Sequence, residues 1–455
     1  MMMLLAVGIN SLQAQLTGTK TIPGNYATLA LAITDLNTQG VGAGGVTFNI
    51  AGGYTETLTG RLDITATGTA ANPIIFQKSG GGANPVITSY TGIATATSAA
   101  MDGMIALIGS DYVTFDGINL QEAAANTDAT TTMEYGYGLF KASATDGANN
   151  NAIKNCTITL NRVNNTAPTS GPAFQGSNGI ALLACTQLAM QTVITVTAAS
   201  GASSNNTFYS NTIQNVNNGI CLSGFPGASP FTLCDTGNDI GGTSNATGNT
   251  IINFGGGTGA TNACAAVFVK DQWTFNVSYN TVNNNNGSGV NHVQTNRGIF
   301  ANASSIGASA TINNNNVTIT GGTSTTAIDW AIDCEMAQSG AAGNTISINN
   351  NTISITKTTA TAVALTAIWV QSAPTTMNVN GNTITNFNCS STSTTDVGVI
   401  RSGLAGIGTL NINNNNISGV SFTSASGTAY CIGNTASVNT AVNISGNNIN
   451  GINFT

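Results

Sequence analysis

Residues 345–355 read TISINNNTISI, the strongest structural signal in the chain. Apolar and polar residues alternate on either side of three asparagines, a pattern typical of two short β-strands that each bury one face. Asparagine also tolerates the left-handed backbone that a sharp turn requires. The stretch therefore predicts a strand, a tight corner and a second strand.

The centre of this stretch, residues 348–353, recurs along the chain. The repeated unit has an apolar residue, two turn residues, Asn, Thr or Asn, and then Ile or Val. Clear copies lie at 208–213, 277–282, 312–317, 379–384, 412–417 and 444–449, and weaker ones at 113–118, 153–158 and 246–251. Successive copies are about 31 to 40 residues apart, except for one longer step before 208–213. Repeats of this length indicate a stacked architecture.

A second motif lies between the copies and pairs a small residue with a larger, mostly aliphatic one. Its members are Gly138-Leu139, Gly179-Ile180, Gly219-Ile220, Ala266-Val267, Gly298-Ile299, Ala331-Ile332, Ala367-Ile368, Gly398-Val399 and Ala429-Tyr430. Each cycle of the two motifs is one rung with three short strands. No cycle offers an amphipathic helix, which excludes leucine-rich, ankyrin and tetratricopeptide repeats. We therefore predict an all-β fold, a right-handed parallel β-helix of about ten or more rungs.

The fourth position of the corner unit is asparagine in most copies. Stacked rungs would place these side chains about 4.8 Å apart, close enough for each amide to bond its neighbours. We predict a structural asparagine ladder with no ligand. Its members are Asn211, Asn249, Asn280, Asn315, Asn351, Asn382, Asn415 and Asn447. Glycine or asparagine stands before six of these asparagines and suits a positive φ, at Gly248, Gly381, Gly446, Asn314, Asn350 and Asn414.

The two ends of the chain differ from the repeats. Residues 1–15 are similar to a truncated secretory signal peptide, and no stretch elsewhere is long and apolar enough to span a membrane. Residues 25–36 predict an amphipathic helix that caps the first rung, so 16–120 should hold this cap and irregular rungs. Regular rungs should fill 121–455, which end within a repeat, and we expect a fragment of a longer, secreted or cell-surface protein.

Composition narrows the function. Only 6% of the residues are charged, with Lys+Arg 10 and Asp+Glu 17, so the chain has no basic patch for nucleic acid. Eight cysteines are scattered singly and there is one histidine, which predicts no metal site and no cofactor. The cysteines could form disulfides in an exported protein or remain as buried thiols.

The first 120 residues resemble a known group. Residues 21–29 (TIPGNYATL), 45–50 (GVTFNI), 53–56 (GYTE), 74–77 (IIFQ) and 111–118 (DYVTFDGI) are similar to large secreted proteins of Bacteroidetes. These proteins carry pectin-lyase-like β-helices and usually end in a type IX secretion sorting domain, which this sequence lacks. The resemblance implies the fold and export, and little about chemistry.

Aligning the second motif suggests one candidate site. The position after the aliphatic residue should point outward, and it reads Phe140, Ala181, Cys221, Phe268, Phe300, Asp333, Trp369, Ile400 and Cys431. Asp333 and Glu335 would then share a face, about 7 Å apart. That separation suits an inverting glycosidase pair. Lys270 or Arg297 would lie nearby for an acidic sugar.

The same column supports a simpler hypothesis. Phe268, Phe300 and Trp369 on a neutral surface would form an aromatic strip that contacts extracellular polysaccharide or a surface protein. Alternatively, loops cover these rings and the strip is packing. The sequence favours a non-catalytic, adhesin-like or carbohydrate-contacting module. The alternative is a polysaccharide-degrading enzyme, a glycoside hydrolase or polysaccharide lyase, that uses Asp333 and Glu335.

Overall fold

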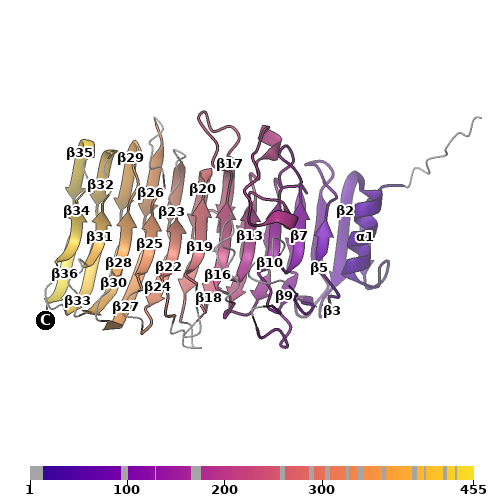
Figure 1. Ribbon diagram of the computed structural model, residues 1–455, viewed down its shortest axis with the longest axis horizontal. Helices are drawn as coiled ribbons and strands as arrows, with labels where there is room; N and C mark the ends of the chain where they lie inside the picture. The colour runs from indigo at the N-terminus through magenta and orange to yellow at the C-terminus, as the bar shows by residue number, and fades with distance from the viewer. Residues whose placement is uncertain are drawn as a thin grey trace, which may run out of the picture.

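The chain forms one long parallel β-helix whose coils stack along a single axis (Figure 1). Three parallel sheets, here called A, B and C, run along it, and the coil is right-handed, as parallel crossovers almost always are. The structure is a computed structural model that describes residues 14–93, 101–128, 130–164, 176–256, 262–285, 292–302, 308–323, 327–336, 343–360, 365–391, 397–403, 406–423, 428–435 and 438–454. The predicted fold class is confirmed.

The described part of the chain gives sheets A, B and C 13, 12 and 11 strands. Sheet A contains β1 (Leu16–Ile22), β2 (Val41–Ala51), β5 (Ile74–Ser79), β8 (Val113–Asp116), β11 (Ala152–Lys154), β14 (Thr207–Tyr209), β17 (Asp235–Ile240), β20 (Gln272–Ser278), β23 (Ser309–Asn313), β26 (Thr345–Asn349), β29 (Thr376–Asn380), β32 (Ile407–Asn413) and β35 (Val438–Ser445).

Sheet B contains β3 (Thr55–Thr57), β6 (Val86–Thr88), β9 (Asn119–Gln121), β12 (Thr157–Thr159), β15 (Thr212–Gln214), β18 (Thr250–Ile252), β21 (Thr281–Asn283), β24 (Asn316–Thr320), β27 (Thr352–Ala360), β30 (Thr383–Ser391), β33 (Asn416–Thr423) and β36 (Asn448–Phe454). Sheet C contains β4 (Leu62–Ile64), β7 (Gly103–Ile108), β10 (Tyr135–Phe140), β13 (Asn178–Leu183), β16 (Asn218–Ser223), β19 (Cys264–Lys270), β22 (Asn296–Ala301), β25 (Asp329–Cys334), β28 (Leu365–Val370), β31 (Val397–Ser402) and β34 (Ala429–Asn434).

The core is built from columns of like residues. Ile348 of β26 pairs in register with Val379 of β29, and Ile353 of β27 pairs with Ile384 of β30. All four side chains are buried. Near the N-terminal end, the column holds Phe48, Phe76 and Phe115, whose rings stack with centroids 4.7 and 4.9 Å apart. Vertical stacking of equal shapes lets each rung bury its apolar face on the next.

The corner between sheets A and B holds the asparagines predicted for the ladder. From Asn211 to Asn447, each Nδ2 donates to the Oδ1 of the next asparagine at 2.9–3.1 Å. Each Nδ2 also donates to the carbonyl of an apolar residue in the preceding rung, as Asn351 does to Ile312 at 2.8 Å. The corner thereby pairs backbone groups that no strand ladder reaches.

Positive φ values precede most of these asparagines. Asn350 has φ 56° and Gly381 has φ 66°. The expectation for Gly248 is wrong, because its φ lies outside the positive range and another constraint applies. A Cβ at Gly248 would lie 2.0 Å from the carbonyl oxygen of Tyr279, so glycine is required there for space.

A helix covers the N-terminal end of the coil (Figure 1). Helix α1 (Leu29–Gln39) buries Leu29, Ala32, Ile33 and Leu36. It begins later than predicted because the Thr28 side chain accepts a hydrogen bond from the Leu31 amide, which makes Thr28 the N-cap. Two short 3-10 helices, Gln187–Ala189 and Ala199–Gly201, lie in a longer connection. Within the described part of the chain, no helix has the length and apolarity needed to cross a bilayer.

Candidate functional site

The outer face of sheet C carries the predicted aromatic and acidic column. Phe268, Phe300, Asp333 and Trp369 occupy paired positions on β19, β22, β25 and β28. Arg401 follows Trp369 in the same row, where the sequence alignment had placed Ile400. At the other end of the column the row holds Gly138 in place of Phe140. The register was thus predicted correctly in the middle of the column and wrongly near its ends.

The small residue of the second motif explains this register. A Cβ on Gly298 would lie 2.4 Å from the Ala331 carbonyl oxygen and 2.6 Å from a Val317 methyl group. The position therefore faces the core at a bend, where bulk is excluded. The sequence alignment of the second motif was wrong in three rungs, at Gly138-Leu139, Gly398-Val399 and Ala429-Tyr430. The residues that occupy the motif positions in these rungs are Gly136-Tyr137, Val399-Ile400 and Cys431-Ile432. Thus Ile400 and Cys431 do not belong to the outward column.

The aromatic strip is not exposed, so the expectation of an open contact surface is wrong. Phe268, Phe300 and Trp369 are 3%, 5% and 9% exposed. The two phenylalanine rings meet edge to face at 5.5 Å. Arginine guanidinium groups cover the column, with Arg297 3.9 Å from the Phe300 centroid and Arg401 4.7 Å from that of Trp369. The strip is therefore a second core on the outside of sheet C.

The acidic pair lies within this covered surface. Asp333 is 0% exposed, and the Nε of Arg297 donates to its Oδ2 at 2.6 Å. Burial raises the pKa of Asp333 to about 8, although Arg297 acts in the opposite direction, and the charge of Glu335 adds to the rise. Glu335 follows two positions later and is half-buried. Lys270 lies on β19, two strands away from β25.

This geometry opposes a catalytic role for the pair. A general acid must come within hydrogen-bond reach of the substrate oxygen that it protonates. Neither oxygen of Asp333 is accessible, and the side chain that contacts it is Arg297. The structure therefore encloses Asp333, while Glu335 lies just beyond the end of β25.

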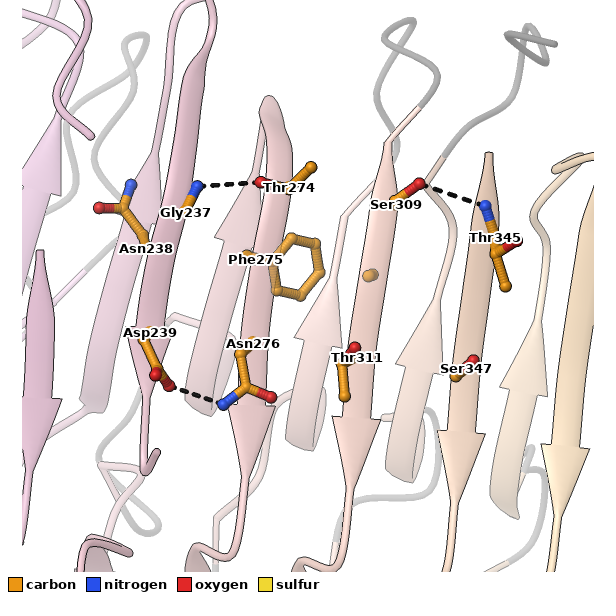
Figure 2. A pocket seen from close by; sticks show the side chains of 11 residues that line it. Gly237, Asn238, Asp239, Thr274, Phe275, Asn276, Ser309, Thr311, Thr345 and Ser347 are labelled. Atoms are coloured by element: carbon orange, nitrogen blue, oxygen red, sulfur yellow. Dashed lines mark hydrogen bonds between the residues drawn. The ribbon is translucent and has the colours of Figure 1, made fainter. Parts of the chain in front are cut away.

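An open hollow lies instead on the outer face of sheet A (Figure 2). It has a volume of about 430 Å³ and extends over β17, β20, β23 and β26. Asp239, Asn276, Thr311 and Ser347 form one register column along it. Figure 2 shows a second file formed by Thr274, Ser309 and Thr345, with Phe275 between β20 and β23.

Hydrogen bonds fix the side chains at one end of the hollow. The Nδ2 of Asn276 donates to Asp239 Oδ1 at 2.6 Å, and Tyr209 donates its hydroxyl to Asp239 Oδ2 at 2.5 Å. Burial and this hydrogen bond raise the pKa of Tyr209, which keeps it a donor. The Gly237 amide donates to Thr274 Oγ1 at 3.0 Å. Among the described residues that line the hollow, Asp239 is the only charged one.

The polar column continues beyond the hollow. Ser347 is followed by Asn378, Asn411 and Asn443 at paired positions. Asn411 donates to Asn378, and Asn443 donates to Asn411, both at 2.8 Å. The sequence contained a signal for this surface: from Asn276 onward, each member stands four residues before a ladder asparagine.

The cysteines and the histidine form no recognisable reactive site. All eight cysteines are free, and seven are buried. This agrees with the buried-thiol alternative. Burial lowers the pKa of His292 to about 4. Among the residues that the structure describes, no three His, Cys, Asp or Glu side chains are grouped to hold a metal ion.

No family model matches the sequence, and no curated protein matches it. Among solved structures, the chain is similar to an alginate lyase from Paenibacillus sp. str. FPU-7 at 12% identity and TM-score 0.34, with 93% of this chain and 99% of that one covered. It is similar to PfbA, a surface adhesin of Streptococcus pneumoniae, at 12% identity and TM-score 0.39, with 93% and 89% covered.

A third similar structure is a GH136 lacto-N-biosidase from Eubacterium ramulus, at 11% identity and TM-score 0.35. The alignment covers 90% of this chain and 62% of that chain. Sequence identities this low leave the function to be argued from the residues of the chain itself.

Proposed function

We propose that the protein is an exported β-helix module that contacts polysaccharide through the outer face of sheet A, without catalysis. The observation that carries this proposal is the 430 Å³ hollow and the polar column that extends from it. Volumes of a few hundred Å³ are typical of small-ligand sites. The hollow extends over four rungs of sheet A, so a linear chain bound along it would continue over Asn378 and Asn411.

The chemistry of the lining suits a neutral glycan. Hydroxyl groups of Thr311, Ser347 and Ser309 can both donate and accept hydrogen bonds. Asp239, Gly242 and Ser278 hold the Asn276 amide in place between them. Rungs repeat about every 4.8 Å, so a bound chain would meet a polar side chain at each rung. Phe275 borders the hollow, but it is 5% exposed and packs in the core, so the hydroxyl and amide groups carry the proposed contact.

The described lining of the hollow holds one acid, which suits binding rather than hydrolysis. Glycoside hydrolysis generally uses two carboxyl groups on either side of the scissile bond. The lining contains one carboxylate, Asp239, and its two oxygens already accept from Asn276 and Tyr209. The other candidate pair, Asp333 with Glu335, lies under the arginines of sheet C.

Export is part of the proposal. The similarity of residues 1–15 to a truncated signal peptide is the feature that suggested secretion or attachment to a cell surface. Residues 1–13 of the expected signal peptide lie outside the described residues. The resemblance of residues 21–29 and 111–118 to secreted Bacteroidetes proteins points the same way.

A glycan array tests the proposal. The purified chain should bind at least one extracellular polysaccharide, and Asn276→Ala with Thr311→Ala should weaken that binding while Trp369→Ala leaves it unchanged in the folded protein. A reducing-sugar assay on each bound glycan should show no turnover. Turnover that Glu335→Gln abolishes would overturn the non-catalytic assignment, and loss of binding only in Trp369→Ala would move the surface to sheet C.

A further inference from the structure

Two lysine–aspartate pairs are buried in the coil, and they differ in their surroundings. Lys357 of β27 places its Nζ 2.5 Å from Oδ2 of Asp329 on β25, and each side chain is 1% exposed. Lys141 lies 3.3 Å from Oδ1 of Asp235, and both side chains are 0% exposed. Dehydrated ionic pairs are costly unless hydrogen bonds satisfy both partners. The two pairs meet this condition to different degrees.

We propose that Lys357 and Asp329 are joined by an intramolecular amide bond that links two neighbouring rungs. In this reaction the neutral Nζ of Lys357 attacks Cγ of the protonated Asp329 carboxyl group. An Nζ–Cγ bond forms, the Cγ–OH bond breaks, and the departing hydroxyl takes one Nζ proton to leave as water. The step consumes no oxidant or cofactor, and it is independent of the proposed glycan surface.

The hydrogen bonds around the pair do not use every proton and lone pair of the two groups. Nζ of Lys357 has two acceptors, Asp329 Oδ2 and the Ala327 carbonyl at 3.1 Å, although an ammonium offers three protons. Oδ1 of Asp329 has no donor among the residues that the structure describes. Burial raises the pKa of Asp329, which favours the protonated carboxyl group that the reaction uses.

The site also holds the two groups close together. A Cβ on Gly321 would lie 2.7 Å from Asp329 Oδ2 and 3.0 Å from Lys357 Cδ, so glycine provides the space and its backbone closes one side. Holding reactants in this way can correspond to an effective concentration of about 10⁵ M or more. A surface pair would not benefit to this extent, because its side chains spend most of their time apart.

Asn296 supplies a donor for the transition state. It is the partner of Asp329 on the neighbouring strand β22, and its buried side chain acts as a hydrogen-bond donor that lowers the pKa of Asp329. A donor beside the carboxyl group can stabilise the oxygen that becomes negative when Nζ attacks. The amide product would still let Nζ–H donate to the Ala327 carbonyl.

The pair of Lys141 and Asp235 provides a natural control. Nζ of Lys141 donates to Gly201 O, Ser203 Oγ and Asp235 Oδ1, so all three protons are used. Oδ1 of Asp235 also accepts from the Ser203 amide, and Oδ2 accepts from Gln272. Both charged groups therefore have hydrogen-bond partners, so we expect no amide bond between Lys141 and Asp235.

Proteolysis of the unfolded chain tests the bond. A protease that cleaves after glutamate cuts at Glu335, which separates Asp329 from Lys357. Segments 135–335 and 336–455 should remain together on a denaturing gel in the wild type and separate in Lys357→Arg, whose guanidinium stays protonated and cannot attack. The intact wild-type chain should be lighter than its sequence mass by one water molecule.

Trypsin gives an internal comparison within the same chain. It should cleave after Lys141 and fail to cleave after Lys357, since an amide removes the charge that trypsin recognises. Wild-type measurements alone decide the question if Lys357→Arg does not fold. Separated segments, the full sequence mass and cleavage after Lys357 in the wild type would overturn the proposal.

Discussion

The outer faces of sheets A and C are built from the same coil and serve different purposes. On sheet A, outward positions carry Thr, Ser and Asn and remain half-buried around an open hollow. On sheet C, outward positions carry Phe300, Trp369 and Asp333, which lie under Arg297 and Arg401. Strand alternation fixes which way a side chain points. It does not fix whether water or ligand reaches that side chain.

The two faces therefore differ in their role. The sheet C face adds a second apolar layer outside the coil, which stiffens a rod that has few charges on its surface. The sheet A face leaves hydrogen-bonding groups free for a partner.

The asparagine corner supports both faces, so breaking it should have the largest effect. Asn351 accepts from the amide and the Nδ2 of Asn315, and it donates to Ile312 O and Asn382 Oδ1. Asn351→Leu would leave several buried groups unpaired and should reduce the free energy of unfolding by roughly 4 kcal/mol. Chemical denaturation measures this. Asn378→Ala, on the outer face of sheet A, is the matched control, and an unchanged midpoint in Asn351→Leu would contradict the role of the ladder.

Truncating a side chain of the sheet C column should reduce the free energy of unfolding almost as much. Phe300→Ala would remove a ring that is 5% exposed and leave a cavity, with an expected loss of about 3 kcal/mol. Thr311→Ala on sheet A, where the side chain borders the hollow, should change stability by less than about 0.5 kcal/mol. Equal effects in thermal unfolding would show that the two faces do not differ.

The acid on sheet C should make stability depend on pH. The folded pKa of Asp333 is raised from 3.8 to about 8, so the folded state keeps a proton that the unfolded chain releases. The stabilisation that protonated Asp333 provides is complete below pH 4 and is lost as the pH rises toward 8. Over this range the free energy of unfolding should fall by up to about 1.4 kcal/mol per pH unit. The Asp333→Asn variant should lack this decline. If the free energy of unfolding changes with pH in the same way in both proteins, the role of Asp333 is contradicted.

Trp369 should be shielded from solvent. A variant with Trp273→Phe and Trp330→Phe leaves it as the only tryptophan. Because its side chain is 9% exposed and faces Arg401, acrylamide should quench its fluorescence far less than that of free tryptophan. Efficient quenching in the folded protein would restore the exposed aromatic strip.

Much of the fold could be read from the sequence, because stacked rungs repeat the same local signals. The corner unit located the asparagines, and the α1 segment was recognised by its apolar spacing. The outward column was misread at Ile400 because Gly398-Val399 satisfied the motif one residue early, and only pairing with Ile368 settles the register. Burial of Trp369 depends on arginines from neighbouring rungs, which no single repeat specifies. The hollow on sheet A depends on which outward side chains are small across four rungs.

Blocking the hollow tests the proposed function most directly. Ser347 lines the hollow on sheet A, and Ser354 stands on the outer side of sheet B in the same rung. For a polysaccharide that the wild type binds, Ser347→Trp should reduce the association constant at least tenfold, and Ser354→Trp should leave it within a factor of two. Equal affinity in Ser347→Trp and the wild type, with both proteins folded, would contradict the assignment of the sheet A face.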